Sequence, residues 1–338
     1  MKRTYIITAF LCIATLVLHA QRITFTFQDG IRNGVLKNQM EATISALLTE
    51  FNTAYNQHRR LQLDNFNLSE KAKKSLQFNW DSIATFTCDF DQNVSRCLTA
   101  TTGYEVREIY VTMHPRRPSE YSGTLNREFS IGFDKTSGQI LHARVTLEDN
   151  TYRTVMSQGS DVTDMRRRME ILKFVEDFRS FYDEKDIKSL ERIYSDDALI
   201  ITGTVMKPDP NMRDRAARLR PEIKYNRFTK KQYIESLKGI FSRNKYIKVK
   251  FEDISVVKHP AKDNFYGVAL KQNWKSMNGA GGIRYEDDGY LFLLWEFPEE
   301  EGGQPLVHVR TWQPEKDKNG HIILDEDERF TVNDFFVP

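Results

Sequence analysis

The chain has 338 residues, of which 40% are hydrophobic, with 49 Lys plus Arg against 47 Asp plus Glu. The apolar content, which includes 22 Phe and 14 Tyr, is enough for packed cores and argues against disorder over most of the chain. The formal net charge of +2 gives no basic excess, so we expect no nucleic-acid partner. The length predicts about two domains.

The segment 1–20 has the three parts of a secretory signal peptide. Lys2 and Arg3 form the positive start, residues 5–18 form an apolar run, and Ala20 precedes Gln21. A membrane anchor is the alternative, but the run is shorter than the ~20 residues that span a bilayer. We therefore expect cleavage after Ala20, a periplasmic, extracellular or envelope-associated location, and no transmembrane segment in the mature chain.

Two cysteines, Cys88 and Cys97, remain after this cleavage. Because an exported chain enters an oxidising compartment, the pair predicts a short-loop disulfide. Two free thiols are the alternative, since spacing alone does not show that the side chains face each other.

An internal repeat is visible in two places. Four positions recur at one constant spacing, and they are Phe51, Tyr55, Leu63 and Phe66 against Phe178, Tyr182, Leu190 and Ile193. Residues 108–115 resemble residues 253–260 at a larger spacing. The larger spacing implies an insertion in the second copy, and we assign it to a long Arg- and Pro-rich loop over 207–227.

Each copy passes from helices to strands. In the second copy the strands are predicted at 246–257, 265–274, 290–297 and 306–312. Residues 152–164 are predicted to connect the copies. The pattern predicts an α+β fold with an antiparallel sheet.

Residues 174–203 contain a long helix, a short helix and the segment Tyr-Ser-Asp-Asp-Ala before a strand. This segment, with the strands that follow to Trp312, resembles the nuclear transport factor 2-like (NTF2-like, SnoaL-like) superfamily. The chain is also similar to exported Bacteroidetes proteins with a degenerate first copy, on stretches 88–91, 94–97, 287–297 and 308–314. The resemblance implies two tandem cone folds, each with helices on a curved antiparallel sheet: a degenerate domain at 21–157 and a better-kept domain at 165–338 that includes a C-terminal tail.

The last strand carries the candidate site. His308, Arg310 and Trp312 alternate with Val307, Val309 and Thr311, so each set is predicted to share one sheet face. If the polar set faces inward, it lines a cavity together with Trp274 and Tyr290 that suits an anionic or aromatic ligand. If the valines face the core instead, His308 and Arg310 pair with surface acids such as Glu296.

Catalytic signals are sparse, and His308 is the one candidate for a general acid or base. The seven histidines are dispersed, so we expect no metal site and no cofactor. Residues 315–326 match a calcium loop in part, but a hairpin turn over 317–320 explains the same residues better. The acidic and apolar tail from Asp325 is predicted to pack on the second domain, with a docking peptide for an envelope protein as the alternative.

These observations favour an exported, non-enzymatic ligand-binding or protein-interaction scaffold. Its expected partners are a small anionic or aromatic ligand and an envelope protein. The alternative is a SnoaL-like small-molecule enzyme of the isomerase or hydrolase type, with a pocket around His308 and Arg310.

Overall fold

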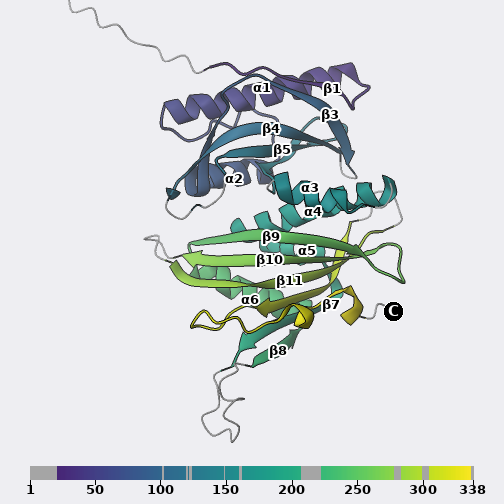
Figure 1. The fold of residues 1–338 in the computed structure, drawn as a ribbon. Helices are drawn as coiled ribbons and strands as arrows, with labels where there is room; N and C mark the ends of the chain where they lie inside the picture. Colours follow the sequence, from purple (N-terminus) through teal and green to yellow (C-terminus); the bar gives the residue numbers. More distant parts are fainter. Residues whose placement is uncertain are drawn as a thin grey trace, which may run out of the picture. The chain divides into compact units, whose positions relative to one another are not determined.

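The computed structural model describes residues 21–100, 103–118, 121, 124–147, 149–159, 162–206, 222–277, 283–298 and 304–335 (Figure 1). The predicted signal peptide lies outside these residues. Over the described part, the chain is α+β, with two six-stranded curved sheets and packed helices. No helix within it combines the length and apolar character that a bilayer crossing requires.

The chain divides into two compact units. Unit 1 comprises residues 1–97, 106–133 and 137–143, and unit 2 comprises 98–105, 134–136 and 144–338. The main segment of unit 2 starts at Arg144. The sequence pattern predicts the domain boundary later, at 157–165.

The elements that lie wholly or mostly in unit 1 run from an edge strand through a long helix to a sheet. They are β1 (Phe25–Asp29), α1 (Gly34–Asn56), α2 (Glu70–Phe78), a π-helical turn (Asn79–Ile83), β2 (Ala84–Thr87), β3 (Gln92–Ala100), β4 (Gly103–Pro115), β5 (Asn126–Asp134) and β6 (Ile140–Val145). The sheet order is β1-β3-β4-β5-β6, with β2 paired to β4. Helix α1 is capped by Asn33, whose side chain accepts hydrogen bonds from the backbone N–H groups of Val35 and Leu36.

The predicted disulfide is wrong, because Cys88 and Cys97 are both free, buried thiols. The Cys88 thiol donates to the Phe90 carbonyl at 3.3 Å and lies 3.4 Å from the Gln92 side-chain amide. Gln92 begins strand β3 and Cys97 lies five residues along it, so extended geometry carries Cys97 roughly 16 Å away. A disulfide requires Cα atoms within about 7 Å of each other.

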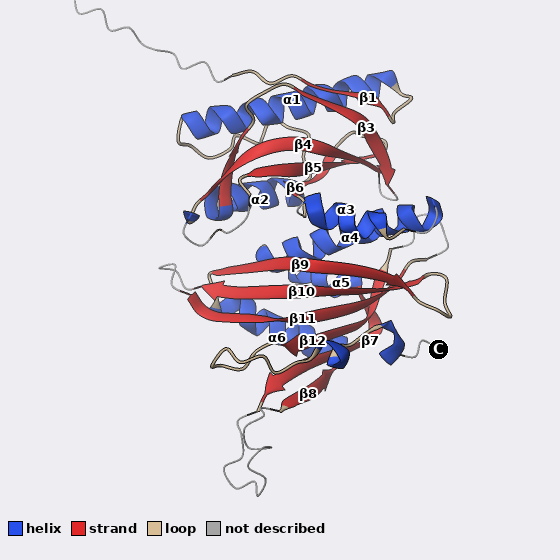
Figure 2. Cartoon of the chain, in the orientation of Figure 1, coloured by secondary structure: helices blue, strands red, loops and turns tan. Residues whose placement is uncertain are grey.

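Unit 2 passes from helices to a second sheet (Figure 2). Its elements are α3 (Asp149–Ser157), α4 (Val162–Asp183), α5 (Ile187–Ile193), β7 (Tyr194–Val205), β8 (Ile223–Phe228), α6 (Lys230–Arg243), β9 (Tyr246–Lys258), β10 (Phe265–Met277), β11 (Ile283–Glu296), β12 (Leu306–Pro314) and two short 3-10 turns, Glu326–Glu328 and Val332–Asp334. The sheet order is β8-β7-β12-β11-β10-β9. Helix α6 starts with a capping box in which Thr229 and Gln232 satisfy each other's backbone N–H groups.

Three details of unit 2 differ from the sequence prediction. The sheet is mixed rather than antiparallel, because β12 pairs with β7 in parallel. The end of the predicted 207–227 loop belongs to β8, which pairs antiparallel with β7, and residues 207–221 lie outside the described residues. Strand β11 begins at Ile283, before the predicted start at 290.

The two faces of this sheet have different covers. On the helix-facing side, strand residues such as Leu291, Leu293 and Trp295 join Phe178 of α4 and Tyr233 of α6 in one core. On the other side, a smaller apolar cluster holds Phe292, Leu294 and Val309 under the tail residues Phe330, Val332 and Phe335. The described part of the tail therefore packs on unit 2, as the first of its two alternatives predicted.

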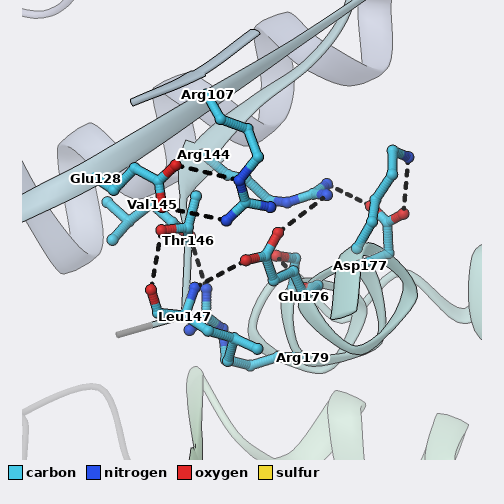
Figure 3. Close-up of polar contacts among 11 residues, drawn as sticks. Arg107, Glu128, Arg144, Val145, Thr146, Leu147, Glu176, Asp177 and Arg179 are labelled. Atoms are coloured by element: carbon cyan, nitrogen blue, oxygen red, sulfur yellow. Dashed lines mark hydrogen bonds and ion pairs between the residues drawn. The ribbon is translucent and has the colours of Figure 1, made fainter. Parts of the chain in front are cut away.

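A buried ion-pair group fixes residues 144–147 to helix α4 (Figure 3). Arg144 pairs with Asp177 and lies 3.8 Å from the carboxylate of Glu176, whose side chain is 0% exposed. The same Glu176 side chain accepts the backbone N–H of Leu147 at 2.9 Å. Arg179 donates to the carbonyl of Val145 at 2.8 Å. Because each buried charge has partners, we assign this group a structural role.

Matching backbone features occur at the two repeat spacings. After α1, the N–H groups of residues 57, 58 and 59 bond to the carbonyls of 53, 55 and 54; after α4, those of 184, 185 and 186 bond to 180, 182 and 181. His58 and Lys185 both adopt positive φ, at 51° and 56°. Within the strands, Glu108 and Asp253 do the same, at 61° and 50°. Non-glycine residues adopt this conformation uncommonly.

Candidate functional site

Strand β12 contains an irregularity at its most polar point. In the pairing with β11, Val309 is opposite Leu294 but Val307 is opposite Trp295, so His308 is skipped. The register with β7 shifts at the same place. An extra residue in one strand is a β-bulge. Beyond the bulge, each residue lies on the sheet face opposite to the one that simple alternation predicts. Val307 consequently packs in the helix-facing core and Val309 in the opposite cluster.

The bulge places Arg310 on the helix-facing side. Its guanidinium carbon lies 4.9 Å from the centre of the Tyr233 ring, and the residue is 5% exposed. The buried atoms Nε and Nη1 have no hydrogen-bond partner within the described residues. No described carboxylate forms an ion pair with Arg310.

Three tyrosines surround this guanidinium: Tyr182 at the end of α4, Tyr194 at the start of β7 and Tyr233 in α6. We call these residues and Arg310 the Arg310 cluster. The Tyr182 and Tyr233 hydroxyl oxygens are 2.7 Å apart. Tyr194 and Tyr233 meet edge to face, with ring centres 5.9 Å apart.

Tyr194 and Tyr233 cannot neutralise Arg310 at ordinary pH. Burial, the largest effect, raises the pKa of Tyr194 and Tyr233 well above the usual tyrosine value, so both remain neutral hydroxyls. Burial also lowers the pKa of Arg310, but the neighbouring Tyr233, Tyr182 and Tyr194 oxygens raise it by more. The guanidinium therefore stays charged, as arginine does in proteins generally.

Two predicted ligand residues share the helix-facing side with Arg310. Trp274 is half-buried and meets the Tyr182 ring edge to face at 5.4 Å between centres. Trp312 is 9% exposed and lies two residues beyond Arg310, on the same side. Its ring crosses Gly289 of β11, where an added Cβ would come within 2.7 Å of the indole.

His308 lies on the opposite side of the sheet. Its Nε2 is 2.6 Å from the Glu296 carboxylate and its Nδ1 is 3.9 Å from that of Asp197. Its ring centre is 5.3 Å from that of Phe265, which belongs to the cluster under the tail. The prediction that His308 shares a face with Arg310 and Trp312 is therefore wrong, because the bulge separates them. The pairing with Glu296 matches the alternative prediction for His308, whereas Arg310 does not follow that alternative.

Tyr290 is also away from the Arg310 cluster. Its hydroxyl donates to the Glu315 carboxylate at 3.1 Å, and the Arg329 guanidinium carbon lies 3.7 Å from its ring centre. Lys271 completes this group with an ion pair of 2.8 Å to Glu315. These contacts stabilise the end of β12 against the tail.

The segment that resembles a calcium loop is a hairpin turn. The Asp317 carboxylate accepts the backbone N–H groups of Asn319 and His321, and the Gly320 N–H bonds to the Asp317 carbonyl. Across the described residues, no group of three His, Cys, Asp or Glu side chains is arranged to hold a metal ion.

One further titratable group lies beside the cluster. Asp183 follows Tyr182 at the end of α4, and its carboxylate accepts the Val249 N–H of strand β9 at 2.7 Å. Burial raises the pKa of Asp183 to about 7, while Arg179 acts in the opposite direction. Val249 is paired with Trp274 across the sheet.

The sequence pattern assigns no site role to Tyr182, Tyr194 or Tyr233. Tyr182 stands out only as a repeat position, because an aromatic residue at helical spacing indicates a core position. The available signal is the arginine itself, since a charged residue within an apolar strand requires compensation.

No protein-family model and no curated protein matches the chain. Among solved structures, Bd1075 of Bdellovibrio bacteriovorus matches at 16% identity and TM-score 0.32, over 54% of this chain and 49% of Bd1075. The match therefore spans about half the length of Bd1075. Kfla4162 from Kribbella flavida matches at 12% identity and TM-score 0.33, over 46% and 94% of the two chains. ActVI-ORFA from Streptomyces coelicolor matches at 10% identity and TM-score 0.32, over 43% and 95%. Scores of this size carry no conclusion about what the chain binds or does.

Proposed function

We propose that unit 2 binds a small anionic ligand at the Arg310 cluster, and that the protein acts by binding rather than by catalysis. The observation that carries this proposal is a buried guanidinium with two unpartnered nitrogens and no described counter-ion. An anion placed beside Nε and Nη1 would supply both the missing charge and the missing hydrogen-bond acceptors.

The energetic argument is that two buried nitrogens of Arg310 lack a hydrogen-bond acceptor and that no described carboxylate pairs with its charge. Burying an ion costs several kcal/mol unless it is paired and hydrogen-bonded. The contact with the Tyr233 ring returns about 2 kcal/mol in a desolvated setting. The remaining cost is what an anionic ligand would offset.

The enzyme alternative loses its main support. It required His308 and Arg310 in one pocket, and the two side chains lie on opposite faces of the sheet. Tyr194 and Tyr233 of the cluster have raised pKa values, so they donate hydrogen bonds but do not accept protons near neutral pH. This set suits recognition of an anion better than acid–base chemistry.

We also propose that the two units are copies of one NTF2-like fold. The repeated helix-end hydrogen bonds and the paired positive-φ residues support this duplication, since they recur at the spacings of the sequence repeat. Export of the chain with cleavage after Ala20 remains part of the proposal and rests on the sequence of the segment 1–20.

Thermal unfolding of the full mature chain tests the binding proposal. Acetate, benzoate, sulfate and inorganic phosphate would be compared at equal ionic strength, with the wild type, Arg310→Met and Arg329→Met. Arg329 is a matched control, because it also lies over a tyrosine ring but on the other sheet face. Binding to the folded state raises stability by about 2.7 kcal/mol at a ligand concentration 100 times Kd.

We expect at least one anion to stabilise the wild type and Arg329→Met but not Arg310→Met. Without ligand, Arg310→Met should be as stable as the wild type or up to about 4 kcal/mol more stable, because an apolar side chain replaces an uncompensated charge. If no anion raises the melting temperature through Arg310, the proposal is wrong.

A further inference from the structure

We infer that the ligand of the Arg310 cluster is a small aromatic carboxylate. This inference rests on the proposed function and adds the chemical class of the ligand. It draws on the charge of the cluster, on its count of hydrogen-bond donors and acceptors, and on the rings that surround it.

The charge of the cluster favours a monoanion. Arg310 supplies one positive charge, and the buried Tyr194 and Tyr233 hydroxyls are neutral. A carboxylate would leave the buried site neutral, whereas a doubly charged phosphate would leave an unpaired negative charge. Burial of an unpaired charge is strongly disfavoured, so inorganic phosphate should bind poorly.

The hydrogen-bonding groups of the cluster are mainly donors. Arg310 offers N–H groups on Nε and Nη1 and has no acceptor. The Tyr182 and Tyr233 hydroxyls share one hydrogen bond, and each hydroxyl of the cluster carries one O–H donor. A carboxylate accepts at both oxygens and donates nothing, so it matches this set.

Several aromatic rings pack around Tyr182 of the cluster. Tyr182 meets Phe178 edge to face at 4.9 Å between ring centres, Trp274 at 5.4 Å and Phe241 at 6.3 Å. Edge-to-face and offset contacts between rings contribute beyond simple area burial. A ligand whose carboxylate meets Arg310 would find these rings beside Tyr182.

Trp274 gives the ligand body a direction. It is the half-buried ring of this group, whereas Tyr182, Tyr233 and Phe178 are buried. Because Tyr182 contacts both the polar cluster and Trp274, a planar body would extend from Arg310 along Tyr182 towards Trp274. Its approach should therefore alter the environment of the Trp274 indole.

Isothermal titration of the full mature protein tests the ligand class with four probes: benzoate, cyclohexanecarboxylate, acetate and inorganic phosphate. Benzoate and cyclohexanecarboxylate carry the same charged group and a ring of similar size, so their ratio isolates the aromatic preference. We expect benzoate to bind about 5- to 10-fold more tightly than cyclohexanecarboxylate, the size of an aromatic pair contact. Benzoate should also exceed acetate by at least about 10-fold, because acetate buries almost no apolar surface.

Variants assign these preferences to residues. Arg310→Met should weaken benzoate binding at least about 100-fold, since it removes a charge-assisted partner. Trp274→Leu should abolish the preference for benzoate over cyclohexanecarboxylate and leave the acetate affinity unchanged. Arg329→Met should change none of the four affinities. If Arg310→Met does not fold, Tyr233→Phe replaces it and should weaken both ring carboxylates about 5-fold through the lost hydroxyl.

The outcomes separate the inference from the proposed function. Equal affinity for benzoate and cyclohexanecarboxylate, or tighter Arg310-dependent binding of phosphate, would overturn the aromatic-carboxylate inference and leave anion binding intact. Absence of binding by all four probes would overturn both. Benzoate binding that survives Arg310→Met would place the ligand elsewhere and also overturn both.

Discussion

Asp183 is expected to make the stability of unit 2 fall as pH rises from about 4 to about 7. Its carboxylate is half-buried at the end of α4 and accepts the Val249 N–H at 2.7 Å. Burial raises its pKa from 3.8 to about 7, against the opposing effects of Arg179 and Lys248, and Glu184 adds to the rise. The folded state therefore binds the proton more tightly than the unfolded state does.

The direction and size of the effect follow from proton linkage. Below pH 4 the carboxyl group is protonated in both states and costs nothing. Between pH 4 and 7 the unfolded chain ionises first, so folding loses stability, and above pH 7 the loss is complete. A pKa difference of about 3, at 1.36 kcal/mol for each unit, gives an upper limit of about 4 kcal/mol. Because the group is only half-buried, solvent screening reduces this to about 1–2 kcal/mol.

Asp183→Asn isolates this contribution, because asparagine keeps an acceptor oxygen for Val249 and has no charge. Urea unfolding at pH 5, 6.5 and 8 should show the largest gain in stability of the variant over the wild type at pH 8, with the difference shrinking towards pH 5. The screened charge cost sets the gain at pH 8 at about 1 to about 2 kcal/mol. Glu235→Gln is the control, since this carboxylate is exposed and pairs with Lys238 on the surface of α6. A variant that is less stable than the wild type at pH 8, or a difference that does not change with pH, would refute the reasoning.

Four further predictions concern the rest of the chain. Arg144→Ala should destabilise the protein by about 3–5 kcal/mol in denaturant unfolding, because it leaves the buried Glu176 carboxylate without its cation; a loss below about 1 kcal/mol would contradict the structural role. Cys88 and Cys97 should both be alkylated in denatured, non-reduced protein and react slowly in the native state, because both are buried and burial raises the pKa of Cys88; a disulfide-linked peptide would contradict this. Intact mass of protein exported by its host should begin at Gln21, and retention of the segment 1–20 would refute cleavage. A fragment spanning 144–338 should unfold cooperatively on its own, and a non-cooperative melt would show that unit 2 depends on unit 1.

The strands of unit 2 could be predicted because alternation and aromatic content are strong along most of each strand. The start of β11 could not, because Arg284, Glu286, Asp287 and Asp288 resemble a polar loop. Part of β11 is an exposed ladder in which Glu286 pairs with Lys275 of β10, so its charge gives no indication of a strand.

The candidate site was predictable only in part. Trp274, Tyr290, His308, Arg310 and Trp312 were predicted as one group if the polar set faces inward; the structure places Trp274, Arg310 and Trp312 on the helix-facing side and His308 and Tyr290 away from them. The error at His308 comes from the bulge, since a period of two assumes that no residue is skipped. The tyrosines escape prediction because α4, β7 and α6 all lie far from Arg310 of β12 in the sequence, and only tertiary packing brings them to it.

The most direct test of the central claim is a crystal structure of the mature protein with 4-bromobenzoate, in which the anomalous signal of bromine locates the ligand. The account predicts a carboxylate within hydrogen-bond distance of Arg310 Nε or Nη1 and a bromine peak on the Trp274 side of Tyr182. Full-occupancy ligand beside His308 on the opposite sheet face, with no density at Arg310, would contradict it.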